Sequence, residues 1–441
     1  MGRHAKDITG FVKDLIAIED IESKKRIFKK VLNIAYKNGI YPSSIHDFYI
    51  ARGKGGLGGF TVPAINLRSM TYDLARAILR VAKRNNSGAF IFEIAKSEMG
   101  YTAQAPYEYS AVILAAAIKE GYSGPVFIQA DHTQANLKKF KENPEKEIES
   151  LQALIAEAIE FGFYNIDIDS STLVDLTQSN VRKQQYYNFD TCAKLTQFIR
   201  RVEPKGITVS VGGEIGEVGH KNSTPEELRV FMEGFKDRLR KGLIGISKIS
   251  VQTGTSHGGV VLPDGSIAQV ALDFDTLKTL SEIARKEYGL AGAVQHGAST
   301  LPPEAFHKFA ECETAEVHLA TEFQNMLYDS KHFPLELKEK IYAWLKVNAA
   351  SERKEGETDE QFFYKTRKKA LGPFKGEIMG LADTARDAIA SEVELKFEFL
   401  FKQLKVINSK ELVVQHISLK RVISRKRKEK AALVHDGEGA D

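Results

Sequence analysis

The sequence predicts a closed (β/α)8 barrel, or TIM barrel, preceded by helices and followed by a helical extension. From Phe60 onward, short runs rich in β-branched and aromatic residues alternate with helix-length segments. That alternation is typical of parallel strands joined by crossover helices. Polar residues follow several of these runs, which is where barrel enzymes carry their functional side chains. Together these observations indicate an α/β enzyme built on one barrel.

Eight strand runs can be placed along the chain, and a helical stretch follows nearly every one. The predicted strands are 60–66, 89–94, 125–131, 163–169, 208–214, 246–252, 291–295 and 315–319. The predicted helices between them are 72–84, 110–120, 149–160, 189–202, 225–240, 274–287 and 302–309. Eight repeats of strand then helix predict a closed barrel rather than an open sheet.

The regions that flank the barrel are predicted to be helical. Residues 8–37 carry apolar side chains at helical spacing, which indicates one or two helices before the first strand. Beyond Phe333 the chain turns to long charged helical segments at 335–348, 359–371 and 378–404. We therefore divide the chain into three parts: an N-terminal helical segment (1–55), the barrel (56–332) and a helical extension with a basic tail (333–441).

A glycine cluster at 53–59 precedes the first predicted strand. Gly53, Gly55 and Gly58 have the G-x-G-x-x-G spacing of a dinucleotide-binding loop. That fingerprint requires a strand before it and a helix directly after it, whereas here the strand-like FTVPAI follows. We expect a flexible loop or a loop that covers the substrate rather than a dinucleotide-binding loop.

The composition is that of an ordinary globular protein, with 441 residues of which 43% are hydrophobic and 27% charged. The net charge of +4 comes from 62 basic against 58 acidic residues, and a basic cluster at 420–430 is interpreted as a solvated or oligomer-contacting tail. Cys192 and Cys312 give no disulfide framework, which fits a reducing compartment. No apolar run approaches the roughly 20 residues of a membrane span, and the start lacks the apolar stretch of a signal peptide. We expect a cytoplasmic enzyme that binds neither a membrane nor nucleic acid.

The candidate catalytic and metal-binding residues stand at the ends of successive predicted strands. Because functional groups in this fold gather at one face of the barrel, we expect them to converge. Three imidazoles with carboxylates beside them form the donor set of a catalytic zinc site, which keeps one position open. The sequence predicts a divalent metal held by His132, His257 and His296. The full set, in chain order, is Asp131, His132, Asp169, Glu214, His257 and His296.

Small residues beside the second and third histidines predict a site for phosphate. Glycine and hydroxyl residues follow each of these histidines, so exposed backbone N–H groups can cradle an anion there. The segment HLATEF, at the opening of the helix after the last strand, is a second place where this fold binds phosphate. We expect a phosphorylated sugar beside the metal. The candidate residues are Gly258, Gly297, Ser299, Ala320 and Thr321.

These motifs resemble those of the class II, metal-dependent fructose-bisphosphate and tagatose-bisphosphate aldolases over roughly residues 60–327. TVPAIN is similar to the family's opening strand, and QADHTQ to its motif with an aspartate before the first metal histidine. NIDIDSS resembles its Ile-Asp-x-Ser strand, and VGGEIGEVGH its glycine-rich segment with a glutamate. TGTSHGG and QHGAST are similar to the second and third metal-histidine motifs, and HLATEFQN to the closing phosphate loop.

The resemblance implies a role for each candidate. Asp131 would transfer a proton, the three histidines would bind the active metal, and Asp169 and Glu214 would hold that metal in another position. Zinc is the expected metal, although three imidazoles also suit cobalt, manganese or iron. A monovalent cation is an additional candidate. Retro-aldol cleavage needs a base and an electrophile, so Asp131 and the metal suffice without a Schiff-base lysine.

The chain departs from the family pattern at three places. The family's acidic loop after strand five is here 219–222, with sequence GHKN, which leaves Glu217 as the nearest second proton-transfer group. His318 stands where the family has an asparagine that helps to polarise the enediolate. The segment 134–149 is longer than usual. The loops that choose the substrate therefore differ most from the family.

Three functions remain open from the sequence. The first is an aldolase that makes and cleaves fructose 1,6-bisphosphate, or the tagatose isomer, through dihydroxyacetone phosphate and glyceraldehyde 3-phosphate. The second is a metal-dependent sugar epimerase that works by retro-aldol cleavage and recombination. The third is a non-catalytic barrel that binds nucleic acid through its basic tail. We expect a homo-oligomer.

Overall fold

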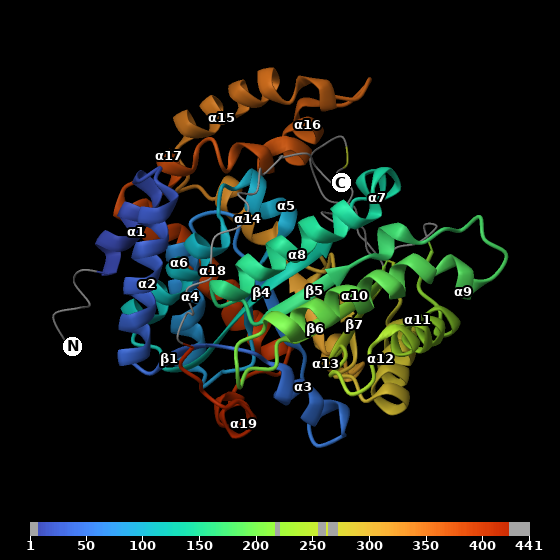
Figure 1. Cartoon of the computed structure of the whole chain (residues 1–441). Helices are drawn as coiled ribbons and strands as arrows, with labels where there is room; N and C mark the ends of the chain where they lie inside the picture. The colour runs from blue at the N-terminus through green and yellow to red at the C-terminus, as the bar shows by residue number, and fades with distance from the viewer. Residues whose placement is uncertain (1–7, 217–220, 255–261, 263–271, 423–441) are drawn as a thin grey trace.

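A closed barrel of eight parallel strands forms the centre of the molecule, with helices around it (Figure 1). The computed structural model describes residues 8–216, 221–254, 262 and 272–422. Strand β9 pairs with β2, and β4 pairs with β5, which closes the ring. All eight predicted strands overlap observed ones, so the predicted (β/α)8 barrel is confirmed. The barrel strands are β2 (Val62–Asn66), β3 (Ile91–Ala95), β4 (Gly124–Gln134), β5 (Asn165–Asp169), β6 (Ser210–Gly216), β7 (Lys248–Val251), β8 (Ala293–Gln295) and β9 (Glu316–Leu319).

A ninth strand, β1 (Ile40–Ser43), lies outside the ring and was not predicted. It pairs in parallel with the first part of β4, where Ile40 is opposite Gly124. The side chain of Asn165 joins this strand to the barrel, because its amide nitrogen donates to the carbonyl groups of Ser43 and Ile128. The N-terminal segment therefore extends the sheet at the amino end of β4.

Every predicted helix between the strands is present. The run from Ala111 to Ile118 in α6 is buried throughout, and such an all-apolar helix needs cover on more than one side. Helices α1 (Ile8–Ala17) and α2 (Ile21–Lys37) pack on α6 and supply that cover. The helices between strands are α4 (Thr71–Arg84), α5 (Lys96–Tyr101), α6 (Pro106–Glu120), α7 (Leu137–Glu142), α8 (Pro144–Glu160), α9 (Val181–Gln184), α10 (Tyr186–Val202), α11 (Pro225–Arg238), α12 (Phe274–Tyr288) and α13 (Phe306–Glu311).

The glycine cluster lies at the amino-terminal side of the barrel. It follows helix α3 (His46–Gly53) and leads into the amino end of β2. The N–H of Gly59 donates to Glu313 at 2.8 Å, and Arg285 donates to the carbonyl of Leu57 at 3.1 Å. The prediction that this loop covers the substrate is wrong, because a loop that enters the amino end of a strand lies opposite the strand ends that form the site.

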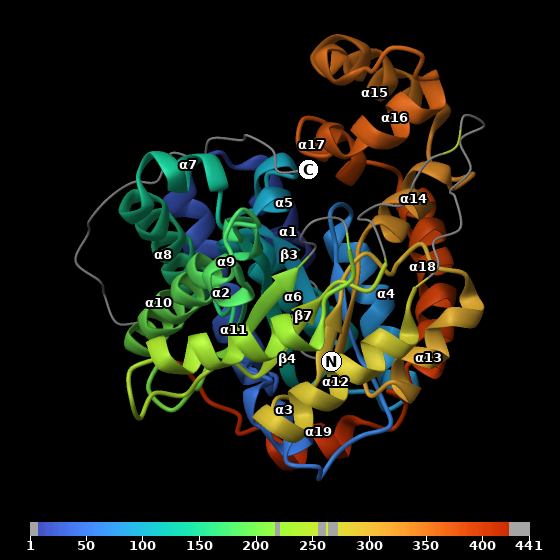
Figure 2. The ribbon, with the colours of Figure 1, turned by 90° about the vertical axis from the view of Figure 1, so that its right-hand side faces the viewer.

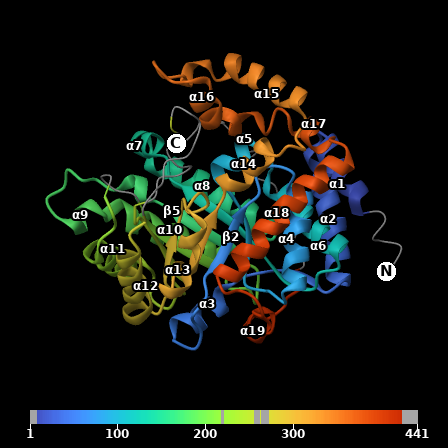
Figure 3. The same ribbon diagram turned by 180° about the vertical axis from the view of Figure 1, so that it is seen from behind.

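Helix α18 (Asp383–Gln403) completes the outer ring although it lies far along the chain. It packs beside α4 and α14 (Thr321–Asp329) on the outside of the barrel (Figure 3). Phe397 stacks on Phe323 with ring centroids 4.7 Å apart, and Phe401 contacts Phe90. The carbonyl of Leu404 accepts a hydrogen bond from the N–H of Thr61 at 2.9 Å. Part of the predicted extension is thus a wall of the barrel.

The part of the extension before α18 lies on the side where α5 and α14 begin, which is the carboxyl side of the strands (Figure 2). Gly372 donates to the carbonyl of Tyr101 at 2.9 Å, and Arg367 binds Asn325 and Asp329 of α14. None of the described helices is long and apolar enough to cross a membrane. The helices of this part are α15 (Leu335–Asn348), α16 (Asp359–Thr366) and α17 (Lys375–Met379). Helix α19 (Lys410–His416) follows α18 and packs beside α3, at the other end of the barrel.

Candidate active site

A bulge in β4 brings two consecutive side chains to the inside of the barrel. In a regular strand, neighbours such as Asp131 and His132 point to opposite faces. The register with β5 shifts between Ala130 and Thr133, and His132 has a φ of 39°. As a result Asp131 Oδ1 lies 2.7 Å from His132 Nδ1. The sequence placed the strand end at Asp131, whereas the strand continues through this bulge to Gln134.

Three histidines surround the carboxylate of Asp131. Its Oδ1 atom lies 2.7 Å from His132 Nδ1, 3.2 Å from His318 Nδ1 and 3.5 Å from His296 Nε2. The ring of His296 lies between the other two, with both centroid distances 4.1 Å. The structure therefore brings together two of the three predicted metal histidines and adds His318.

The charges of this cluster depend on one another. Burial opposes ionisation of Asp131, but His132 and His318 hold the pKa of this carboxyl well below its usual range. Burial also disfavours charge on the imidazoles, yet Asp131 raises the pKa of His132, and Glu93 with Asp131 raises that of His318. Burial, His318 and His132 lower the pKa of His296. Asp131 is thus ionised and His296 is neutral.

Two more predicted residues lie beside His132. Glu214 Oε2 is 3.8 Å from His132 Nε2, and burial followed by the charge of Asp169 raises the pKa of Glu214 to about 8. Asp169 is oriented by Gln134, which donates at 2.6 Å, and by the Ser171 hydroxyl, which donates at 2.7 Å. Both carboxyl groups are therefore within reach of a cation bound at His132.

Below this layer the barrel interior contains a buried charge network. Lys248 Nζ donates to Asp167 at 2.9 Å, to Gln129 at 2.8 Å and to Glu316. Glu316 Oε1 also lies 2.7 Å from His318 Nε2, which connects this network to the histidine cluster. Burial disfavours charge on both, but Lys248 lowers the pKa of Glu316, and Asp167 with Glu316 raises that of Lys248. These groups therefore remain charged inside the barrel.

Gly212 of β6 is required for this network to fit. A Cβ atom at Gly212 would collide with the carboxylate of Asp167 and lie 3.0 Å from Lys248 Cε. The contact between Lys248 and Asp167 would then have to open. The first glycine of the VGGE motif thus makes room for an ion pair inside the barrel.

The donor set fits a divalent metal. Asp131 engages His132 Nδ1, and the Ser250 hydroxyl lies 2.7 Å from His296 Nδ1, so Nε2 is the nitrogen that can coordinate a metal in each ring. Candidate ligand atoms of His132, Asp169 and Glu214, and those of Asp131, His132 and His296, lie within 4.8 Å of one another in each group. Buried carboxylates outnumber cationic side chains in this cluster, which favours a bound cation.

The predicted anion residues that the structure describes lie at the ends of β8 and β9. Gly297 has a φ of 67°, a conformation that favours glycine. The Ser299 hydroxyl accepts a hydrogen bond from the N–H of Glu322, in the first turn of α14, at 3.3 Å. Thr321 begins α14 and Ala320 precedes it. A helix start with a nearby hydroxyl is a place where anions bind.

Four residues of the sequence predictions lie outside the described residues. They include one metal histidine, its neighbouring glycine and the candidate second proton-transfer group. Their roles stay predictions. These residues are His257, Gly258, Glu217 and His220.

Three buried charged residues that support the site were not predicted from the sequence. Glu93, Lys248 and Glu316 each interrupt an apolar strand run. In a strand that is buried on both faces, a charged residue must find its partner inside the protein. That signal could have identified the network before the structure was known.

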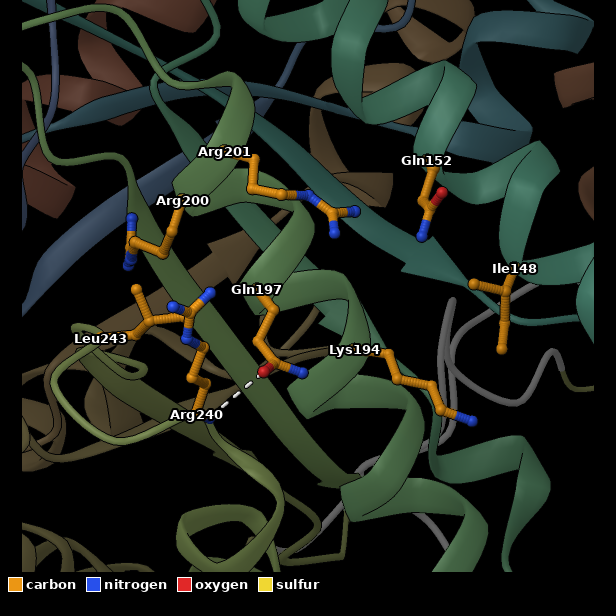
Figure 4. A pocket seen from close by; sticks show the side chains of 8 residues that line it. All are labelled: Ile148, Gln152, Lys194, Gln197, Arg200, Arg201, Arg240 and Leu243. Atoms are coloured by element: carbon orange, nitrogen blue, oxygen red, sulfur yellow. Dashed lines mark hydrogen bonds between the residues drawn. The ribbon is translucent and has the colours of Figure 1, made fainter.

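The structure also contains a basic groove on the outer wall, with a volume of about 300 Å³ (Figure 4). Gln197 accepts a hydrogen bond from the backbone N–H of Arg240 at 3.1 Å, and Arg200 binds Glu203 and the carbonyls of Val209 and Gly245. None of the predicted site residues lines this groove, so it is separate from the strand-end cluster. Its lining residues are Ile148, Gln152, Lys194, Gln197, Arg200, Arg201, Arg240 and Leu243.

The fold and these side chains define a (β/α)8 barrel with a candidate metal site at the carboxyl ends of its strands. The family model described as fructose-bisphosphate aldolase class-II matches residues 54–400. The chain therefore belongs to the class II fructose-bisphosphate aldolase family, which confirms the resemblance seen in the motifs. Among curated proteins, none matches the sequence.

Solved structures with the same architecture share little sequence with the chain. A probable tagatose 6 phosphate kinase from Sinorhizobium meliloti 1021 superposes with a TM-score of 0.56 at 15% identity, over 80% of this chain and 99% of that one. A fructuronate-tagaturonate epimerase from Cohnella laeviribosi has a TM-score of 0.51 at 11% identity, over 81% and 82%. A fructose-bisphosphate aldolase from Campylobacter jejuni has a TM-score of 0.49 at 17% identity, over 84% and 96%. At such identities the likeness concerns the fold.

Proposed function

We propose that the chain is a metal-dependent aldolase that reversibly cleaves fructose 1,6-bisphosphate to dihydroxyacetone phosphate and glyceraldehyde 3-phosphate. The observation that carries the proposal is the cluster of Asp131, His132 and His296 on the side of the barrel that also holds Ser299 and Thr321. Retro-aldol chemistry needs a base, an electrophile and groups that bind the substrate. Asp131 can act as the base, the histidines can bind the metal that serves as electrophile, and Ser299 and Thr321 can bind the phosphate. Family membership supports the same class of reaction.

Asp131 is the proposed base. In the cleavage direction it takes the proton from the hydroxyl next to the breaking carbon–carbon bond, and the electron pair of that bond moves into the ketone fragment as an enediolate. Its depressed pKa keeps Asp131 ionised and able to accept the proton. Asn66 Nδ2 donates to Asp131 Oδ2 at 3.1 Å and fixes the plane of the carboxylate. In the condensation direction Asp131 returns the proton.

We propose His132, His257 and His296 as the metal ligands, with Glu214 and Asp169 as ligands for another position of the same ion. Zinc is the proposed metal because three imidazoles and one open position suit it. When bound, the metal supplies stabilisation of the negative charge that develops on the substrate's oxygen atoms. Asp131 contacts Nδ1 of His132 and Ser250 contacts Nδ1 of His296, which leaves Nε2 of each ring for the metal.

The test is a panel of ketose phosphates, assayed for cleavage with and without a chelator. The expected result is release of triose phosphate, detected by a coupled reductase, that is lost with chelator and restored by zinc. Cleavage that survives complete removal of metal would refute the metal-dependent mechanism. The panel also compares the fructose and tagatose isomers and so identifies the substrate.

A second function, a metal-dependent sugar epimerase, is favoured by one observation. His318 is buried and lies 3.2 Å from Asp131, where the aldolase family has an asparagine. Its raised pKa makes it a proton donor beside the proposed base, so this pair could return a proton to the recombined product. If nuclear magnetic resonance finds only an epimeric ketose and no triose phosphate, the epimerase replaces the aldolase.

The metal site has its own test. Elemental analysis of purified protein is expected to find about one zinc per chain in the wild type and much less in His132→Ala and His296→Ala. His307→Ala is the matched control, because His307 is exposed on α13 and pairs only weakly with Glu311. Unchanged metal content in both site variants would count against the site.

The remaining predictions concern the whole chain. We propose the division into residues 1–55, 56–332 and 333–441, a homo-oligomer and a cytoplasmic location. Light scattering of the purified protein tests the oligomer, and a monomer at micromolar concentration would contradict it.

A further inference from the structure

Arg68 reaches from the end of β2 to the start of α14. Its Nη1 atom lies 3.4 Å from Thr321 Oγ1 and 3.3 Å from Gln324 Oε1. Its Nε atom donates to Glu98 Oε1 at 2.6 Å, and the side chain is 15% exposed. A nearly buried guanidinium thus stands beside the residue predicted to bind the substrate's phosphate.

The two contacts of Arg68 with α14 are long and join it to neutral oxygen atoms, whereas its bond to Glu98 is short. A guanidinium presents five N–H donors in a rigid fork that matches a carboxylate or a phosphate. Charge-assisted bonds to an anion are shorter and roughly twice as strong as neutral ones. An anion at the start of α14 would therefore replace weak contacts with strong ones.

Glu98 connects Arg68 to the proposed base. Its Oε1 accepts from Arg68, and its Oε2 accepts from Asn66 Nδ2 at 2.8 Å and from the N–H of Ala95 at 2.9 Å. The same amide nitrogen of Asn66 donates to Asp131 Oδ2 at 3.1 Å. The chain of contacts from Arg68 through Glu98 and Asn66 to Asp131 sets the guanidinium and the base at a fixed separation.

We propose that Arg68 is a specificity-determining residue that binds the phosphate of the substrate at the start of α14. The inference rests on the proposed function, because it assigns a residue to the anion site of that reaction. Thr321 and Ser299 supply neutral donors at this site, and Arg68 supplies the positive charge. Ketoses without a phosphate would lose the contribution of Arg68 while keeping the rest of the site.

The test compares Arg68→Gln and Arg68→Lys with matched variants of Arg76. Arg76 Nε donates to Glu120 Oε1 at 2.6 Å, the same contact as that between Arg68 and Glu98, but on the outer wall between α4 and α6. Titration calorimetry with inorganic phosphate measures binding without turnover. Steady-state assays with phosphorylated and unphosphorylated ketoses separate KM from kcat.

For Arg68→Gln we expect a Kd for phosphate and a KM for the phosphorylated ketose that rise roughly 10- to 100-fold, the usual range for one charge-assisted pair. Turnover of an unphosphorylated ketose should fall much less than that of the phosphorylated ketose. Arg68→Lys keeps the charge but loses the fork, so its Kd should rise less. Arg76→Gln and Arg76→Lys should match the wild type in all assays.

Several results would overturn the inference. The first is a wild type that binds no phosphate. The second is an unchanged Kd for phosphate in folded Arg68→Gln and Arg68→Lys. The third is an equal loss of activity on phosphorylated and unphosphorylated ketoses. If Arg68→Gln does not fold, the lysine variant decides by the same Kd. Failure of the proposed function is distinct: loss of phosphate binding in Arg68→Gln, with no ketose phosphate cleaved by the wild type, supports Arg68 and rejects the aldolase.

Discussion

The barrel interior and the outer wall use the same ion-pairing chemistry in opposite environments. Inside, Lys248 and Glu316 are 1% and 0% exposed and pair with each other; both also contact Gln129, and Lys248 pairs with Asp167. On the wall, Arg84 of α4 is 51% exposed and pairs with Glu398 of α18. A buried charge that loses its partner pays a large desolvation penalty, whereas an exposed pair is screened by water. Every charge of the interior network therefore needs its partner, whereas an ion pair on the wall can be lost at little cost in stability.

The largest effect is expected at the proposed base. Asp131→Ala should retain metal and lower turnover roughly 10²- to 10⁴-fold, because positioned proton transfer contributes about that factor. Triose phosphate release and metal content measure the two properties separately. Asp190→Asn, which alters an ion pair with Lys194 on the outer side of α10, is the control and should be near the wild type. Near-normal turnover in Asp131→Ala would remove Asp131 from the mechanism.

Breaking the interior network should destabilise the protein strongly. Lys248→Met leaves Asp167 and Glu316 without their cation, and removal of one partner of a buried pair costs about 3 to 5 kcal/mol. Denaturant unfolding measures the loss. The double variant Lys248→Met with Glu316→Gln should lose less than the sum of the single variants, because the two residues are in contact. Additive losses would mean that the network is not coupled.

The buried imidazole of His46, which lies outside the interior network, should make the free energy of unfolding depend on pH. Burial, followed by the charge of Arg200, lowers the pKa of His46 to about 4. Below its unfolded pKa of about 6.5 the unfolded state binds a proton that the folded state does not, so stability falls as pH falls. Between pH 7 and pH 5 the contribution of this group is about 2 kcal/mol. In His46→Gln the free energy of unfolding should vary less over this interval, and an unchanged slope would contradict the shifted pKa.

The smallest effect is expected on the wall. Glu398→Gln weakens the pair with Arg84, and an exposed pair of this kind is worth less than about 1 kcal/mol. The melting temperature should shift slightly, and the shift should shrink further at high salt. A loss of stability as large as that of Lys248→Met would show that ion pairs on the wall and in the interior contribute equally.

Much of the fold could be predicted from the sequence because local patterns carry it. The eight strand runs and the two N-terminal helices follow from periodicity, and observed elements overlap them. Strand β1 escaped prediction because Ile40–Ser43 is short and contains a proline. The alternative in which the glycine cluster covers the substrate was wrong, because the loop enters the amino end of β2, and spacing alone does not show on which side of the barrel a loop lies.

The candidate site was predictable only in part. Motif order identified Asp131, His132 and His296 as neighbours, and the structure brings them together. The charges of Glu93, Lys248 and Glu316 were visible in the sequence but unassigned. Their partners come from strands far apart in the chain, so only closure of the barrel reveals which charges meet.

By itself the sequence determined the order of strands and helices, the family, and the residue types available for metal and phosphate. The tertiary structure decided three further things. The bulge in β4 turns both Asp131 and His132 inward, α18 closes the outer ring, and Arg68 reaches the start of α14. The physical reason is common to all three: periodicity is a local property, whereas these contacts join segments that only the closed barrel brings within hydrogen-bonding or packing distance.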